Sequence, residues 1–295
     1  EIVKDVMLRQ SVKDLTTVSL KATEPGVIDE KYFDGGKRLI VSLTTYNKRI
    51  YEVFLVIETI FSQTLKANKV VLWLDKDEFT RDNLPLSLKR QESRGLDVRF
   101  CHNMYSYKKL VPSLKEYPDD YIVTIDDDIL YPFDLLERLV LAYKQDPSYI
   151  YFTRGALMEM DGVGNPIPYV QWGKINDKEC LQKMCEGSLL AFPTGGAGTL
   201  YPPHYLHQDV TREELFLHLC PKADDLWFKI MSLKAGKASR LVPLYRADDS
   251  NLVTLPDNQE TALHRYNNDK SVNRNDTQLK AILDHYGVSF TDLLT

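Results

Sequence analysis

The sequence predicts an α/β protein built on an open, mixed, mostly parallel sheet that is flanked by helices. Two observations predict this fold class. Short apolar runs alternate with segments of helical spacing over residues 38–125, and the run at 121–125 leads directly into Asp126-Asp127-Asp128. Such alternation is typical of a parallel sheet covered on both faces. A chain of 295 residues can form one large α/β domain, and we expect a single compact unit.

The expected elements follow one another in the order β-α-β-α-β-α-β. The expected strands are residues 38–45, 69–74, 96–101 and 121–125, and the expected helices between them are 51–63, 84–94 and 111–117. Apolar residues recur at helical spacing in each helix, and Gly95 is a natural stop for the second one.

The second part of the chain is expected to mix strands, loops and helices. The expected elements are a helix over 132–146, strands over 149–153, 188–192 and 198–201, a helix from 223 to Gly236 and a closing helix over 277–285. Residues 161–177 and 255–275 are polar and loop-like. Residues 1–36 are expected to be a peripheral N-terminal segment, partly helical around residues 6–15.

Composition excludes several classes of protein. The net charge is −5 with both signs interspersed, so we expect no nucleic-acid partner. No run is long and apolar enough to span a bilayer, although a removed signal or anchor before Glu1 stays open. The four cysteines have no zinc-site spacing, and we expect free thiols, with a Cys180–Cys185 disulfide as the alternative. No GxGxxG or P-loop sequence follows the first strand, so the usual dinucleotide and Walker sites are absent.

Three adjacent carboxylates at the end of a buried strand are the strongest chemical signal in the chain. Asp126, Asp127 and Asp128 repel one another unless a divalent cation lies among them, because hard cations take oxygen ligands. Ligands also bind at the carboxyl ends of strands in open α/β sheets. The triplet therefore predicts a site for a metal-chelated diphosphate. The alternative is an acidic turn that caps the next helix.

The order of these segments resembles the GT-A fold of nucleotide-sugar glycosyltransferases. The likeness is greatest to bacterial family-2-type enzymes of polysaccharide assembly and looser to exostosin-type domains, which also carry a triple Asp. It covers residues 38–264, and it is carried by residues 41–47, 72–75, 124–128, 195–198 and 223–225. The resemblance implies a nucleotide half at about 37–130 and an acceptor half at about 131–295, within a domain spanning 37–295.

The resemblance also implies an activity and a cellular place. We expect a metal-dependent hexosyltransferase that moves a sugar from a UDP-sugar donor to a saccharide or lipid-linked saccharide acceptor in surface polysaccharide synthesis. Such an enzyme would be cytoplasmic, with peripheral association at the inner face of the membrane.

Metal-ion roles follow from the same resemblance. Mn²⁺ or Mg²⁺ would bridge the phosphates of the donor and stabilise the leaving diphosphate. Asp128 would bind the ion, Asp126 would contact the ribose, and Asp127 would support both. His264 is the candidate for a second metal contact, and its alternative is an ordinary surface or packed histidine.

Nucleotide recognition is expected at the ends of the first two strands. Asp75 can accept the N3–H of a uracil, or it can be a simple turn residue. Lys109, with Lys108 beside it, can place a cation near the phosphates or ribose, or it can be a solvated surface lysine. The expected binding residues outside the triplet are Thr44, Thr45, Tyr46, Arg49, Asp75 and Lys109.

The acceptor hydroxyl needs a base, and the pair Asp224-Asp225 at a helix start resembles the one that supplies it in inverting relatives. Asp225 is the expected general base and Asp224 the alternate. The competing interpretation is a routine helix cap. We expect inversion of the anomeric centre, whereas the triple-Asp likeness to exostosin-type domains implies retention, and the sequence leaves both open.

Two further classes compete with a glycosyltransferase. A sugar-phosphate nucleotidyltransferase shares the broad fold but usually carries a glycine-rich, Arg-containing loop after the first strand, and residues 44–49 lack glycine. An inactive carbohydrate-binding homologue is the other alternative. Intact acidic groups at 126–128 and 224–225 argue against lost catalysis.

Overall fold

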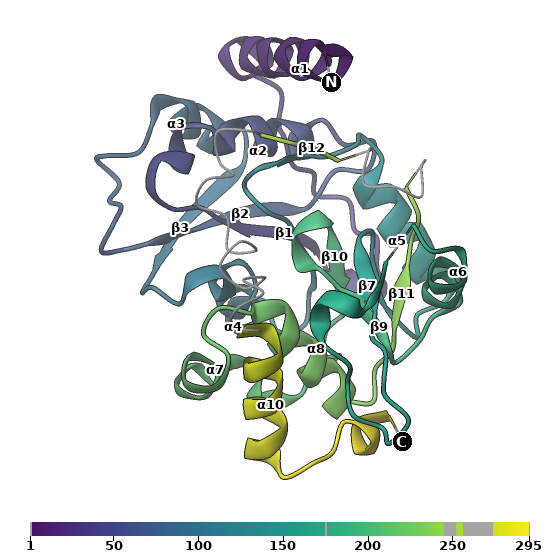
Figure 1. The fold of residues 1–295 in the computed structure, drawn as a ribbon. Helices are drawn as coiled ribbons and strands as arrows, with labels where there is room; N and C mark the ends of the chain where they lie inside the picture. The colour runs from purple at the N-terminus through teal and green to yellow at the C-terminus, as the bar shows by residue number, and fades with distance from the viewer. Residues whose placement is uncertain (1, 175, 245–251, 256–273, 295) are drawn as a thin grey trace.

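A seven-stranded sheet forms the centre of the structure (Figure 1), a computed structural model that describes residues 2–174, 176–244, 252–255 and 274–294. The strand order is β11-β6-β10-β4-β1-β2-β3, and only β10 runs antiparallel to its neighbours β4 and β6. The strands are β1 (Leu39–Thr44), β2 (Lys69–Asp75), β3 (Leu96–Cys101), β4 (Tyr121–Thr124), β6 (Ile150–Phe152), β10 (Thr199–Tyr201) and β11 (Ser239–Leu241). The predicted open, mostly parallel α/β sheet is therefore confirmed.

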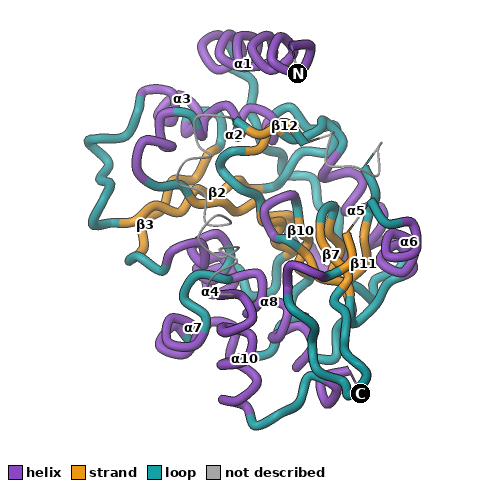
Figure 2. Tube along the Cα trace, in the orientation of Figure 1, coloured by secondary structure: helices purple, strands orange, loops and turns teal. Residues whose placement is uncertain are grey.

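Helices cover both faces of this sheet, as Figure 2 shows for α1, α2 and α3 above it and α4, α7, α8 and α10 below it. The α-helices are α1 (Ile2–Lys21), α2 (Val53–Phe61), α3 (Leu86–Glu92), α4 (Val111–Glu116), α5 (Leu135–Gln145), α6 (Lys178–Glu186), α7 (Glu213–Leu219), α8 (Asp224–Lys234) and α10 (Arg274–Tyr286). A sheet covered on two sides explains why its strands read as continuous apolar runs.

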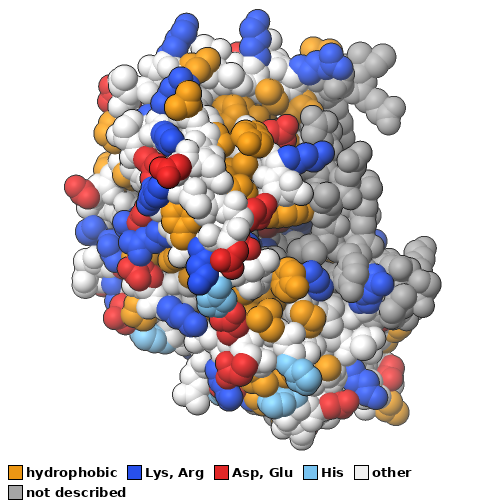
Figure 3. All heavy atoms as spheres, turned by 90° about the vertical axis from the view of Figure 1, so that its left-hand side faces the viewer, with side chains coloured by type: hydrophobic (Ala, Val, Ile, Leu, Met, Phe, Trp, Pro, Cys, Tyr) orange, Lys and Arg blue, Asp and Glu red, His pale blue; other side chains and the backbone are white. Residues whose placement is uncertain are grey.

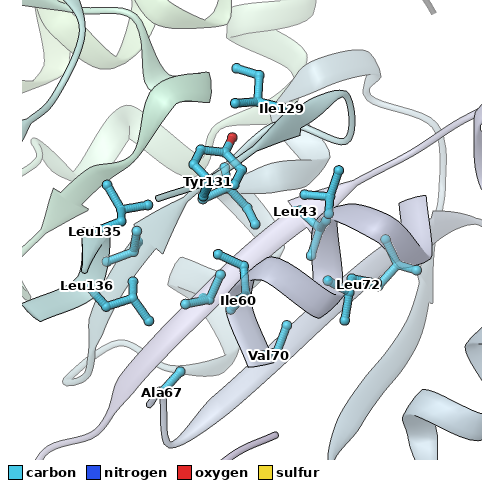
Figure 4. Packing of buried hydrophobic residues seen from close by; sticks show 14 of the residues in the cluster. Leu43, Ile60, Ala67, Val70, Leu72, Ile129, Tyr131, Leu135 and Leu136 are labelled. Atoms are coloured by element: carbon cyan, nitrogen blue, oxygen red, sulfur yellow. The ribbon is translucent and has the colours of Figure 1, made fainter. Parts of the chain in front are cut away.

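The two layers have separate hydrophobic cores because side chains alternate along each strand. On β1, Leu39, Val41 and Leu43 pack with α2, α3 and α5, whereas Ile40 packs with α4 and α8. Figure 4 shows part of the first core, where Leu43 and Leu72 from neighbouring strands face Ile60 of α2 and Leu136 of α5. The sheet is thereby held from both sides, which fixes the positions of the loops at its edges.

Two small sheets extend the second half of the chain. The three-stranded sheet has the order β8-β7-β9, and the two-stranded one pairs β12 with β5. Their strands are β5 (Ile129–Leu130), β7 (Gly155–Leu157), β8 (Gly173–Lys174), β9 (Ala191–Pro193) and β12 (Val253–Thr254). The backbone N–H of Leu255 donates to the carbonyl of Asp128 at 2.7 Å, which ties β12 to the end of the acidic triplet.

Some boundaries differ from the sequence expectation. The strand expected at 188–192 begins only at Ala191, because Ser188 instead pairs with Ser239 at the start of β11. The helix expected at 51–63 is preceded by a 3₁₀ turn, Asn47–Tyr51, so that α2 proper begins at Val53. Helices α6 and α7 and strands β7, β8 and β11 were not predicted. Each is nine residues or fewer, which leaves little periodicity to detect.

The distribution of surface charge and the state of the cysteines are as the sequence predicts. Basic and acidic side chains are interspersed on the face shown in Figure 3 rather than gathered by sign. All four cysteines are free thiols, as expected. Among the residues that the structure describes, no helix combines the length and the hydropathy needed to cross a bilayer.

Candidate active site

A cavity of about 700 Å³ lies where the chain leaves the carboxyl ends of β1, β4 and β6. This edge of an open α/β sheet is the usual place for a ligand. Most of the site residues predicted from the sequence line the cavity, although they come from five separate segments. They are Thr44, Thr45, Tyr46, Arg49, Lys109, Asp126, Asp127, Asp128, Asp224 and Asp225.

One described residue that the sequence predicts for the site, Asp75, is not part of this lining. Asp75 is only 6% exposed, and its Oδ1 accepts the backbone N–H of Asp77 at 2.9 Å, which is the turn role named as its alternative. Its predicted contact with a uracil stays a prediction without support from the cavity. His264 lies outside the described residues.

Asp127 is the buried member of the triplet. Its two carboxylate oxygens accept hydrogen bonds from the Thr45 hydroxyl and from Arg49 Nη1, each at 2.6 Å. Burial raises the pKa of Asp127, and the Arg49 guanidinium opposes that rise. Because both oxygens are engaged by protein groups, Asp127 fixes the loop that carries its neighbours.

Asp128 belongs to the same cluster and lines the cavity. Its Oδ2 lies 3.5 Å from Arg49 Nη2, and its side chain keeps 13% of its accessible surface. Burial raises the pKa of Asp128 to about 7, with Asp126 and Asp127 adding to the effect and Arg49 opposing it. A bound cation would stabilise the ionised form of this carboxylate and so lower its pKa.

The carboxylate oxygens of the triplet suit a divalent ion that keeps some water ligands, rather than an ion that is coordinated by protein groups alone. Asp126 and Asp128 both line the cavity, whereas Asp127 is taken up by Thr45 and Arg49. Among the described residues, no group of three or more His, Cys, Asp or Glu side chains is arranged to enclose a metal ion. Mg²⁺-type sites commonly use one or two carboxylates and complete their coordination with water and phosphate oxygens.

Lys109 joins the triplet to the acidic pair of α8. Its ammonium lies 3.3 Å from Asp126 Oδ1, 3.1 Å from Asp224 Oδ2 and 3.9 Å from Asp225 Oδ1. Burial opposes its charge, but these three carboxylates more than offset that effect and raise the pKa of Lys109 well above its usual value. Lys109 is therefore a permanent cation that holds the two acidic groups on either side of it.

The two aspartates at the start of α8 differ in exposure. Asp224 is buried and accepts a hydrogen bond from the Ser106 hydroxyl at 2.7 Å. The side chain of Asp225 keeps 29% of its accessible surface, and its Oδ1 accepts the Gly195 N–H at 3.0 Å. Burial raises the pKa of Asp225 to about 7, with Asp224 adding to the rise and Lys109 opposing it. A cavity-facing carboxylate with a pKa near neutrality suits a general base.

The helix-cap interpretation of this pair does not fit the structure. Ala223 occupies the N-cap position of α8, and no side chain caps the helix there. The carboxylates of Asp224 and Asp225 instead bind Ser106, Lys109 and the Gly195 backbone.

A 3₁₀ turn, Gly195–Ala197, connects the two acidic groups through its backbone. The Gly195 carbonyl accepts the Thr124 hydroxyl at 2.8 Å, and the Gly196 carbonyl accepts the Asp126 N–H at 3.1 Å and the Tyr131 hydroxyl. A Cβ atom on Gly196 would lie 1.6 Å from Asp126 Oδ2. A side chain at position 196 would therefore have to displace the Asp126 carboxylate.

The segment after β1 forms the other wall of the cavity. Tyr46 is half-buried, and the Arg49 guanidinium carbon lies 5.0 Å from the centre of its ring. The Thr44 hydroxyl donates to the Trp73 carbonyl at 2.8 Å, which fixes the end of β1 against β2. These residues line the cavity at the end of β1. Their role in nucleotide binding stays a prediction.

Sequence reasoning missed a group of residues from the second half that also line the cavity. They include Arg154, Phe192, Thr194, Lys222, Thr254 and Asn275. Arg154 could have been found, because it directly follows an expected strand at 149–153, as the triplet follows 121–125. The others depend on contacts between distant segments, for which the sequence offers no local signal.

Comparison with known proteins supports the fold. No family model matches the chain, and no curated protein matches it. Among solved structures, it is similar to the mannosyltransferase PcManGT from Pyrobaculum calidifontis in complex with GDP-Man and Mn²⁺. That match has a TM-score of 0.51 and 14% identity, and it covers 97% of this chain and 72% of that one.

Two weaker matches are also structures of nucleotide complexes. S. aureus TarS in complex with UDP gives a TM-score of 0.42 at 15% identity, over 70% of this chain and 57% of that chain. A CMP:2-keto-3-deoxy-manno-octonic acid synthetase complexed with CTP gives 0.40 at 11% identity, over 70% and 90%. The chain thus spans little more than half the length of the TarS structure. At these identities the comparisons show a shared fold alone, the GT-A-type α/β fold.

Proposed function

We propose that this protein is a metal-dependent glycosyltransferase that moves a sugar from a nucleoside diphosphate sugar to a saccharide acceptor. One observation carries the proposal: Lys109 holds an acidic triplet at a strand end and an acidic pair at a helix start against one cavity. The triplet has the chemistry to bind a metal-chelated diphosphate, and the pair has the chemistry to activate a hydroxyl.

Donor binding is assigned to the first half, residues 37–130, with UDP as the expected nucleotide. Tyr46 would stack on the base, Thr44 and Thr45 would lie beside it, and Asp126 would contact the ribose. Support comes from the position of these residues along one wall of the cavity. Because Asp75 does not line that wall, the preference for uracil rests on the residues after β1.

Asp128 would hold Mn²⁺ or Mg²⁺, and His264 remains the candidate for a second ligand. A bound divalent ion supplies Lewis-acid stabilisation of the charge that develops on the leaving diphosphate. The chain's own part is to keep Asp128 ionised and in place, through Arg49 and through the bonds that lock Asp127.

Asp225 would act as the general base. As the acceptor oxygen forms its bond to the anomeric carbon, the hydroxyl proton passes to the Asp225 carboxylate, and the bond from that carbon to the phosphate oxygen breaks. Asp224, Lys109 and the Gly195 N–H hold Asp225 in position. A single displacement of this kind inverts the anomeric centre, so inversion is the proposed outcome and retention the alternative.

The acceptor half is assigned to residues 131–295, with a saccharide or lipid-linked saccharide as the acceptor. Tyr169, which lines the cavity and packs edge-on against the buried Phe192, offers aromatic surface of the kind on which sugars pack. We place this synthesis of a surface polysaccharide in the cytoplasm, at the inner face of the membrane.

A donor-turnover assay tests the proposal. The protein is incubated with Mn²⁺ and a panel of UDP-sugars and GDP-mannose, with and without short saccharides. Release of nucleoside diphosphate that requires both the metal and an acceptor is the expected result. Release of pyrophosphate from a nucleoside triphosphate and a sugar phosphate would instead make the protein a nucleotidyltransferase.

Base preference is tested separately by titrating UDP, GDP and ADP in the presence of Mn²⁺. UDP should bind most tightly. Equal or tighter binding of GDP would overturn the uracil assignment while leaving the transferase proposal intact.

A further inference from the structure

Arg154 is a cavity-lining cation that the proposed mechanism does not yet use. It lies between β6 and β7, two residues after β6 ends at Phe152. Strand β10 runs antiparallel to both β4 and β6, so β6 is parallel to β4 and ends at the same edge of the sheet. At a strand spacing of about 4.8 Å, β6 lies about 10 Å from the strand that carries the acidic triplet.

The side chain of Arg154 is anchored on one edge only. Its Nε donates to the Thr194 hydroxyl at 3.3 Å, and its carbonyl accepts the Thr194 N–H and hydroxyl, each at 3.1 Å. Thr194 directly precedes the 3₁₀ turn that binds Asp225 and Asp126. The terminal nitrogens Nη1 and Nη2 have no hydrogen-bond partner among the described residues, although Arg is a five-donor group.

The charge of Arg154 reaches the residues of the same cavity. It opposes the rise that burial causes in the pKa of Asp128, the proposed metal ligand, and in the pKa of Tyr169. Tyr169 in turn lies within electrostatic reach of Asp225. Arg154, Asp128 and Asp225 all line this cavity, so a donor that is bound to the metal ion there would have the guanidinium near its phosphates.

The other cations that line the cavity are Arg49, Lys108, Lys109 and Lys222. Lys108 is 3% exposed and donates to Asn103 Oδ1 at 3.4 Å. Arg49 is paired with Asp127 and Asp128, and Lys109 contacts three carboxylates. Lys222 stacks on Tyr105, with its ammonium 3.4 Å from the ring centre, at the α8 side of the cavity. Across the described part of the chain, Arg154 forms no ion pair with a carboxylate, so its charge is available to a ligand.

We propose that Arg154 binds the distal phosphate of the donor's diphosphate through its two terminal nitrogens and stabilises the charge left there when the sugar departs. A planar guanidinium matches phosphate oxygens in a bidentate manner, which an ammonium cannot do. This inference rests on the proposed function, since it needs a nucleoside diphosphate in the cavity.

Comparing UDP with UMP isolates the distal phosphate. Titration calorimetry with Mn²⁺ should show that Arg154→Gln weakens UDP binding by about 10–100-fold, the loss expected for a hydrogen-bonded charged pair. Binding of UMP should change by less than about twofold, because UMP lacks the phosphate in question. Arg154→Lys should recover only a small part of the UDP affinity. Lys222→Gln, a second cavity cation, is the control and should leave the UDP-to-UMP ratio unchanged.

Each other outcome overturns the inference in a recognisable way. Unchanged UDP affinity in Arg154→Gln with a raised acceptor KM would assign Arg154 to the acceptor. Equal losses for UDP and UMP would make it a structural residue of the cavity, and circular dichroism would show whether the fold had changed. If the unaltered protein binds neither UDP nor GDP with Mn²⁺, the proposed function fails together with this inference.

Discussion

Neighbouring aspartates at this site have different partners and therefore different chemistry. Asp127 is saturated by Thr45 and Arg49, whereas Asp128 keeps a looser contact with Arg49 and lines the cavity. At the helix start, Asp224 is buried against Ser106 and Lys109, while Asp225 stays partly exposed. In each case the cavity-facing carboxylate is the one assigned to the chemistry, and its buried neighbour holds it in place.

The pH dependence of turnover tests the role of Asp225. The base must be ionised to accept a proton, and burial raises its pKa to about 7. At saturating donor and metal ion, kcat should therefore fall as the pH drops below about 7 and level off above it. Asp225→Asn should lose about 10²–10⁴-fold in kcat and also lose this acid limb. Donor affinity should remain nearly unchanged, and a strong loss of donor binding would make Asp225 a donor-site residue instead.

Lys229 is a buried lysine that costs stability. It is 2% exposed, its Nζ has no hydrogen-bond partner among the described residues, and burial lowers its pKa from 10.5 to about 7. The unfolded chain therefore binds more protons at this site between pH 7 and 10.5, so its contribution makes stability rise with pH across that window.

Lys229→Met should raise the free energy of unfolding at neutral pH by about 2 kcal/mol or more, because an apolar chain of similar length replaces an unpaired amine. Urea unfolding at pH 7 and pH 10 measures the effect. The difference between variant and parent should shrink at the higher pH. A destabilised variant, or a difference independent of pH, would show that the amine has a partner.

At the scale of elements, the 3₁₀ turn Gly195–Ala197 couples strand β4 to helix α8. Its backbone accepts from Thr124, Asp126 and Tyr131 and donates to Asp225. The triplet and the pair are therefore placed by one short element, and a displacement of that element would affect both.

Gly196→Ala should disturb the donor site more than the fold. The added Cβ would meet Asp126 Oδ2, and overpacking of this kind costs about 1–3 kcal/mol. We expect UDP affinity in the presence of Mn²⁺ to fall at least about tenfold. Gly162→Ala is the matched control, because nothing lies within 4 Å of its added carbon. Equal UDP affinity in both variants would show that Asp126 can move without loss.

The parallel part of the sheet could be predicted from the sequence because its strands are short apolar runs of their own. The antiparallel strand β10 and the edge strand β11 could not be placed in the sheet, since their partners lie about 50 to 90 residues away in the chain. The same limit applies to the site. The triplet is visible in the sequence as three adjacent carboxylates, and Lys109 is predicted as a binding residue with a surface lysine as the alternative. The contacts of Lys109 with Asp224 and Asp225, and of Arg154 with Thr194, arise only on folding, because these partners lie far away in the chain.

At the scale of the whole molecule, the sheet edge gathers donor, metal and base residues from both halves of the chain around one cavity. Strands β1 and β4 bring the first half, and the turn after β9 with helix α8 brings the second. In this arrangement the acidic triplet and the acidic pair have different roles that can be tested separately. Binding of the metal-chelated donor should depend on the triplet, and proton transfer from the acceptor should depend on the pair.

The most direct test of these two roles is calorimetric titration of UDP into three forms of the protein. Each form is titrated once with Mn²⁺ and once with excess chelator. The unaltered protein and Asp225→Asn should bind UDP with similar affinity, and chelation of the metal should abolish binding in both. Asp128→Ala should keep its fold and lose metal-dependent binding. Metal-dependent UDP affinity that is unchanged in Asp128→Ala would remove the triplet from the donor site and contradict the account.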